Sequence, residues 1–477
     1  MKNINKFIEN VLFQGAAISR GFFHCCAICA LTFSAGAQET DNYYWRGGTW
    51  GQSAELLRID LAGNWAADSS GETVHEISPS ETSNLIFDYA NIADRQHARI
   101  NVYYRTVAVN SVASYVPTEM HMQSGHSLTV LSDWTSSVSS DTKYSASYRT
   151  DDNGDKKSVR FAADTANFLT VGGDMTLSTD KYFTSRIRLG SQQGSSAYTL
   201  TIGGALSFVK NGVDAVGYHA FDMIAFDSTT GTAFSLDVGG LRSSGKAVYM
   251  TTAKNGSISV NFNNNPSGAF AGGSFEGVFA ADSGVSSQLN ITMNGSGRQE
   301  MTIYKASNGS LHGFENDLDG KVDMSIGNLT VNNGEFVMNT EVAVENLYLS
   351  GGRLKFSSAE KVGGMTIDGG TLLFGGTINV GDLTVAAYSA DVVFSAEDLA
   401  AHEITVFEFD YLTDDFDANS VFSAYNEFGQ ELGGSFELTV EMGGSGSLVY
   451  VVPEPAAVAA FIGAAALMFA LRRGGRR

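Results

Sequence analysis

Apolar residues recur with a period of 18 between residues 324 and 394, in a stretch otherwise rich in glycine, asparagine and threonine. Within each copy, apolar and polar positions alternate, which is typical of a β-strand with one buried face. The columns of equivalent positions are Ile326, Val344, Val362 and Val380; Leu329, Leu347, Met365 and Leu383; and Val331, Leu349, Ile367 and Val385. Each copy therefore predicts a short strand whose apolar side is covered by the neighbouring copies.

A corner and a second strand are expected in each copy. The corners hold Asn333-Gly334, Gly351-Gly352 and Gly369-Gly370, and glycine permits the positive φ that a tight bend requires. Two further apolar columns follow them: Phe336, Leu354 and Leu372, then Met338, Phe356 and Phe374. Stacking such copies predicts an all-β fold, a right-handed parallel β-helix (solenoid) with about 18 residues per coil. A set of unrelated hairpins is the alternative.

Weaker echoes of the repeat occur upstream. Leu169–Leu177 resembles Leu200–Phe208, and Val238-Gly239-Gly240 follows Ile202-Gly203-Gly204 by 36 residues, which we interpret as two coils. We therefore expect the parallel β-helix to occupy residues 161–395, with insertions between coils. Residues 396–452 are expected to form a C-terminal β cap, with final strands over Phe436–Val440 and Ser447–Val451.

Aromatic residues concentrate near the start of the region 38–160, which includes Trp45, Trp50 and Trp65, three of the four tryptophans. The end of a solenoid exposes unpaired strand edges, and bulky aromatic side chains can cover them. We therefore expect an aromatic N-terminal β cap. A platform on which these three rings stack against a glycan is the alternative.

The first 37 residues have the pattern of a secretory signal peptide. Lys2, Lys6 and Arg20 precede an apolar stretch, and Ala35 and Ala37 form a small-x-small cleavage site before Gln38. The three cysteines all lie inside this segment: Cys25, Cys26 and Cys29. A lipoprotein signal at Cys29 is the alternative, although the preceding isoleucine is a poor fit. Removal of the segment leaves no thiol for a disulfide or a metal site.

The last 25 residues combine three features. Pro453, Glu454 and Pro455 are followed by an uncharged run over 456–471, which we expect to be a transmembrane helix. Four arginines follow and favour a cytoplasmic tail: Arg472, Arg473, Arg476 and Arg477. An ordinary single-pass anchor is the alternative interpretation.

This arrangement over 453–477 resembles the PEP-CTERM sorting signal of Gram-negative bacteria. The resemblance implies that an exosortase-type processing protease is a partner, that Pro453, Glu454 and Pro455 form its recognition element, and that the ectodomain is released or transferred. The aromatic opening of the chain resembles that of autotransporter-like, passenger-type repeat proteins. Together these resemblances imply a protein held in the membrane by its C-terminal helix and then placed at the cell surface or released.

Net charge narrows the range of partners. The chain carries −21, and removal of the first segment (+2) and the last (+3) leaves −26. An acidic surface of this kind repels nucleic acid, so we expect no nucleic-acid partner.

Catalytic and metal-binding motifs are not found. His121 and His126 are five residues apart, and we expect no partner carboxylate for them nearby in the sequence. We therefore expect neither a metal site nor a cofactor. We expect a structural or adhesive protein of the cell envelope or extracellular matrix, whose partners are exopolysaccharide or other surface proteins. A polysaccharide-active β-helix enzyme or a carbohydrate-binding module is the alternative.

Overall fold

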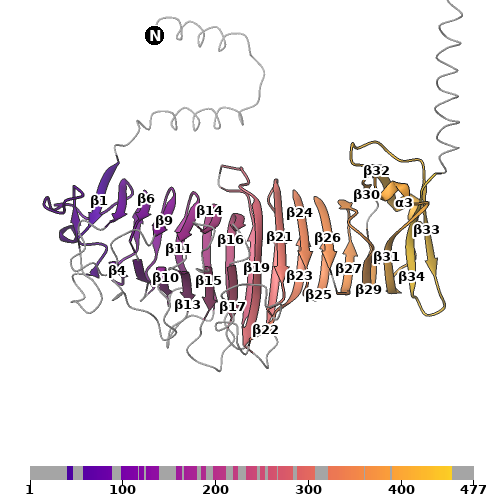
Figure 1. Cartoon of the computed structure of the whole chain (residues 1–477), viewed down its shortest axis with the longest axis horizontal. Coiled ribbons are helices and arrows are strands. Elements are labelled where there is room, and N and C mark those ends of the chain that lie inside the picture. Colours follow the sequence, from indigo (N-terminus) through magenta and orange to yellow (C-terminus); the bar gives the residue numbers. More distant parts are fainter. Residues whose placement is uncertain are drawn as a thin grey trace, which may run out of the picture. The chain divides into compact units, whose positions relative to one another are not determined.

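The computed structural model describes residues 40–46, 57–88, 98–116, 118–122, 125–138, 157–163, 166–179, 184–189, 197–210, 219–223, 233–243, 248–252, 256–265, 267–282, 287–306, 321–358, 360–386 and 389–453. The chain divides into two compact units, Met1–Asp41 and Asn42–Arg477. The described structure is almost wholly that of the second unit, which is all-β with long, mostly parallel sheets (Figure 1).

The strands form two sheets. Sheet A contains β1 Asp41–Trp45, β2 Trp65–Ala66, β3 Ser83–Phe87, β5 Val107–Val109, β6 Ser111–Ser114, β8 Leu128–Val130, β9 Trp134–Val138, β11 Asn167–Val171, β12 Met175–Thr179, β14 Ala197–Lys210, β16 Ala233–Ser243, β18 Ser257–Phe262, β20 Gln288–Met293, β23 Ser325–Val331, β25 Val344–Leu349, β27 Val362–Ile367, β29 Ile378–Val385, β31 Glu403–Leu412, β33 Ser435–Val440 and β34 Gly446–Val451. Sheet B contains β4 Ala98–Val102, β7 Thr118–Met122, β10 Lys157–Ala163, β13 Thr184–Leu189, β15 His219–Met223, β17 Val248–Thr252, β19 Gly273–Asp282, β21 Arg298–Tyr304, β22 Lys321–Asp323, β24 Glu335–Thr340, β26 Arg353–Ser358, β28 Thr371–Leu373, β30 Ala390–Phe394 and β32 Phe422–Asn426. The described helices are short: the 3-10 turns η2 Ala62–Asn64 and η4 Asp398–Ala400, and α3 Ala418–Val421.

The chain passes repeatedly from sheet A to sheet B, and most strands pair in parallel with their equivalents in the next passage. Upstream, each passage contributes two strands to sheet A, such as β11 and β12, before one strand of sheet B. In β14 these two merge, because its first half pairs with β11 and its second half with β12. From β18 to β32 single strands of sheets A and B alternate, apart from the additional strand β22, which pairs antiparallel with β19 of sheet B. This path is β-helix-like, and it buries one continuous apolar core.

The 18-residue repeat is confirmed by the strand register. Leu329 pairs with Leu347, Leu347 with Met365, and Met365 with Leu383, so successive equivalents stack directly over one another. The predicted corners also hold: Gly334, Gly352 and Gly370 have φ of 65°, 64° and 80°, a left-handed conformation that glycine adopts without strain.

One expectation about the upstream region is wrong. Ile202 pairs directly with Val238, so the 36 residues between them make one passage and not two coils. Parallel pairing also begins well before residue 161, since β3 pairs with β6 and β4 with β7. The coil length is therefore 18 only in the downstream repeat. Elsewhere the register partners Leu169 and Leu200 are 31 residues apart.

Glycines let the backbone pack tightly at one corner of sheet A. A Cβ built on Gly172 would lie 2.3 Å from the Leu131 carbonyl oxygen, and one on Gly203 would lie 2.2 Å from the Gly172 oxygen. Gly239 continues the column, at 2.5 Å from the Gly203 oxygen. The repeated Gly-Gly pairs of the sequence are thus required by close contact between backbones in successive passages.

The C-terminal end of the stack is closed by an antiparallel hairpin. Strands β33 and β34 pair with each other, β34 also pairs with β31, and their positions match the two final strands expected from the sequence. Tyr450 of β34 is fully buried and stacks on Phe394 of the last sheet B passages, with ring centroids 4.8 Å apart. The hairpin therefore covers the apolar core that the last coil would otherwise expose.

Candidate functional site

The residues of the two expected targeting signals lie almost entirely outside the described residues. These are Ala35, Ala37 and Gln38 of the first signal, and Glu454, Pro455, Arg472, Arg473, Arg476 and Arg477 of the last. Pro453 is described, and it follows directly on the C-terminal hairpin, where the Val452 N–H donates to the His402 carbonyl oxygen at 2.9 Å. Among the described residues, no helix has the length and apolar character needed to cross a membrane.

Two of the three tryptophans proposed for glycan stacking are buried. Trp45 and Trp65 are each 0% exposed, their ring centroids lie 4.9 Å apart, and both rings contact Phe87. Neither ring therefore offers a free face to a sugar, which corrects the stacking alternative for these two residues and agrees with a cap. Trp50 lies outside the described residues.

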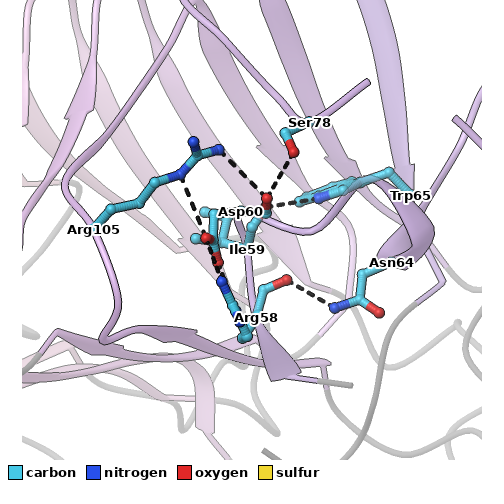
Figure 2. Close-up of polar contacts among 7 residues, drawn as sticks. All are labelled: Arg58, Ile59, Asp60, Asn64, Trp65, Ser78 and Arg105. Atoms are coloured by element: carbon cyan, nitrogen blue, oxygen red, sulfur yellow. Dashed lines mark hydrogen bonds and ion pairs between the residues drawn. The ribbon is translucent and has the colours of Figure 1, made fainter. Parts of the chain in front are cut away.

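A polar cluster secures this aromatic region (Figure 2). Arg58 donates to both carboxylate oxygens of Asp60, at 3.0 and 2.8 Å, and the Arg105 Nε lies 3.4 Å from the same carboxylate. Asn64 and Trp65 donate to the backbone oxygens of Arg58 and Ile59, at 2.8 and 2.9 Å. Because the Asp60 carboxylate is occupied by two guanidinium groups, the cluster is suited to holding this segment in place and not to proton transfer.

Burial of Asp60 acts to raise the pKa of its carboxyl. The hydrogen bond and charge of Arg58, together with the charge of Arg105, outweigh burial and hold the pKa below its ordinary value of 3.8. The ion pairs therefore stabilise the fold above the ordinary pKa, and this stabilisation is lost as the pH falls through the lowered one.

Replacing Asp60 by asparagine is expected to lower the free energy of unfolding by about 2 kcal/mol at neutral pH, because the charge-assisted hydrogen bonds from Arg58 and the ion pair with Arg105 are weakened or lost. Thermal unfolding followed by circular dichroism should show the difference, and it should shrink as the pH falls below 3.8. The exposed Glu76→Gln variant is the control and should match the wild type. A deficit in the Asp60 variant that is independent of pH would contradict this account.

His121 has a carboxylate partner that sequence reasoning missed. Its Nε2 lies 2.6 Å from Glu119 Oε1, and both side chains are largely buried. The sequence alone could have indicated this pair, because residues two apart on a strand project from the same face. His126 is not part of this contact. The described residues contain no group of histidine, cysteine or acidic side chains arranged to hold a metal ion.

An open groove of about 640 Å³ lies at the C-terminal end of sheet A. Its walls come from the connection after β26, from β29 and β31, and from the terminal hairpin. They are formed by Ser358, Glu360, Lys361, Asn379, Glu408, Phe409, Asp410, Thr439, Glu441, Ser445, Gly446 and Ser447. Sequence reasoning did not identify this groove, because its residues come from segments up to about 90 positions apart.

The groove is acidic. Lys361 pairs with Asp410, and Lys305 pairs with Glu360. Glu408 and Glu441 have no cationic partner among the residues that the structure describes. Carboxylates, hydroxyls and an amide suit hydrogen bonding to a polar ligand or attraction of a cationic one. Comparisons with known protein families, with characterised proteins and with solved structures gave no match.

Proposed function

We propose that this protein is an exported structural or adhesive component of the cell surface or extracellular matrix. It is sorted by its C-terminal signal, and an exosortase-type protease is its processing partner. The observation that carries the proposal is the succession of Pro453-Glu454-Pro455, the uncharged run and four arginines. That signal begins where the terminal hairpin ends, so cleavage there would leave the β-structure whole.

The architecture supports a scaffold. We propose that the two long parallel sheets form a right-handed parallel β-helix, because parallel crossover connections are right-handed in nearly all proteins. In a solenoid each coil contacts only its neighbours, so stacking many coils builds a long exposed surface. Such a surface suits an extended structural or adhesive element. The N-terminal aromatic cluster and the terminal hairpin close its two ends.

Polysaccharide binding is the second candidate, and the groove lined by Glu408 and Glu441 favours it over the tryptophan platform. Its hydroxyl, amide and carboxylate groups are those that hydrogen-bond sugars. In this case the protein would still be a surface component, with exopolysaccharide as its partner.

Intact mass spectrometry tests the main proposal. Protein recovered from the outer surface or the medium of the native host is expected to begin at Gln38 and to lack about 25 C-terminal residues. A substitution of Glu454 by alanine should leave the full C-terminus in place, whereas Glu441→Ala, in the hairpin, should not affect processing. Wild-type protein that keeps its full C-terminus in the inner membrane would contradict sorting.

A further inference from the structure

Strand β33 lies at an open edge of sheet A (Figure 1). Among the described strands its one neighbour is β34. Backbone hydrogen bonding in an antiparallel pair alternates from residue to residue. The Glu441 N–H donates to the Ser445 oxygen at 2.7 Å, which fixes this alternation. Phe436, Leu438 and Val440 therefore direct their backbone groups away from β34.

The side chain of Asn419 independently supports this assignment. Its Nδ2 donates to the Phe436 carbonyl oxygen at 2.9 Å, and the Phe436 N–H donates to its Oδ1 at 2.7 Å. The amide thus takes the place that a peptide group of a neighbouring strand would occupy. Phe436 is closed to a further strand, whereas Leu438 and Val440 have no outward backbone partner among the described residues.

The two faces beside this open edge differ in chemistry. Glu437, Thr439 and Glu441 are on the outer face, and Thr439 and Glu441 also line the acidic groove. On the other face Val440 is 42% exposed, and Met442, in the turn that follows the strand, is fully exposed. A strand added to the edge would project alternate side chains toward these two faces.

We propose that the edge at Leu438–Val440 binds an extended peptide segment of a partner protein in which basic and apolar residues alternate. The backbone of the segment would pair with Leu438 and Val440, as in strand addition to other sheet edges. Its basic side chains would meet Glu437 and Glu441, and its apolar ones would cover Val440 and Met442. This site lies outside the sorting signal and does not depend on processing of the tail.

Charge favours such a segment over a second copy of this chain. Pairing that joined Leu438 to Val440 of another copy would place Glu437 opposite Glu441, and like charges directly opposed across strands are destabilising. The net charge of −21 adds long-range repulsion between copies.

Binding of a fluorescent peptide of alternating lysine and valine to the full-length protein tests the proposal, read as fluorescence anisotropy. Val440→Pro removes an outward N–H and leaves the bonds to β34 intact, so it should weaken binding about tenfold. Val440→Ala keeps the N–H and is the matched control, expected to bind more tightly than the proline variant. Glu437→Gln combined with Glu441→Gln should also weaken binding.

Asn419→Ala should strengthen binding, since it frees a third outward residue, Phe436. Circular dichroism would check that every variant is folded. The proposal is overturned if the proline variant binds as well as wild type, or if a glutamate–valine peptide binds equally. A concentration-dependent dimer of the wild type in sedimentation, absent in Val440→Pro, would assign the edge to a second copy and likewise overturn it.

Discussion

Truncating Leu347 to alanine is expected to lower the free energy of unfolding by about 2–5 kcal/mol, the range for large-to-small changes in a packed core. Leu347 is 0% exposed and lies in register between Leu329 and Met365. The missing methyl groups leave a cavity that borders the passages on both sides. Because β-structure of this kind derives its stability from contacts between neighbouring coils, both interfaces are weakened together.

Tyr348→Ala is the matched control, one residue along the same strand on the opposite face. Its side chain is 37% exposed, so its loss should change the free energy of unfolding by less than about 1 kcal/mol. Denaturant unfolding followed by circular dichroism would measure both variants. Equal effects of the two substitutions would show that the Leu347 column is not the buried one.

Adding a single methyl group at Gly203 is expected to destabilise the protein by about 1–3 kcal/mol, the range for overpacking. The added Cβ would lie 2.2 Å from the Gly172 carbonyl oxygen, which belongs to the backbone and cannot rotate away. Relief would require the two passages to separate, and the register on either side of the corner opposes this: Ile202 pairs with Val171, and Leu206 with Met175.

Gly433→Ala provides the comparison for the Gly203 variant. A Cβ at Gly433 meets no atom within 4 Å, and its φ is not in the left-handed region, so this variant should be as stable as the wild type or slightly more stable. Thermal unfolding of the two variants would distinguish the effect of close backbone contact at Gly203 from the general effect of replacing a glycine. A Gly203 variant as stable as its control would contradict the close packing of this corner.

The sequence predicts strand register well where coil length is constant. From β23 to β29 in sheet A, and from β24 to β28 in sheet B, register partners are 18 residues apart, so equivalent side chains such as Val344 and Val362 recur at a fixed interval. Upstream, the connections between strands differ in length, so the 18-residue period is lost. The alternation of apolar and polar residues within each strand remains. For this reason the local pattern identifies the partner strands of Leu169–Leu177, whereas the 36-residue spacing of Ile202 and Val238 does not reveal that it corresponds to one passage.

The candidate sites depend on contacts that local pattern does not encode. Asn419 reaches Phe436 across 17 residues, and Glu408 and Glu441 meet in one groove from different strands. The pair of His121 with Glu119 is different, because strand geometry alone places both on one face. Contacts between side chains two residues apart on a strand can therefore be predicted from the sequence. The closure of a sheet edge by a distant side-chain amide, such as that of Asn419, cannot.

The terminal hairpin has a mechanical consequence. Val451, the last residue of β34, pairs with Glu403 on one side and Ser435 on the other, and Pro453 follows two residues later. A tether attached beyond Pro453 would pull along β34, so the hydrogen bonds of both ladders would bear the load together in shear. Tension along the stacking direction would instead open the sheets one passage at a time. Under a pull of the first kind, the hairpin would therefore hold the last strand of the fold through both of its neighbours.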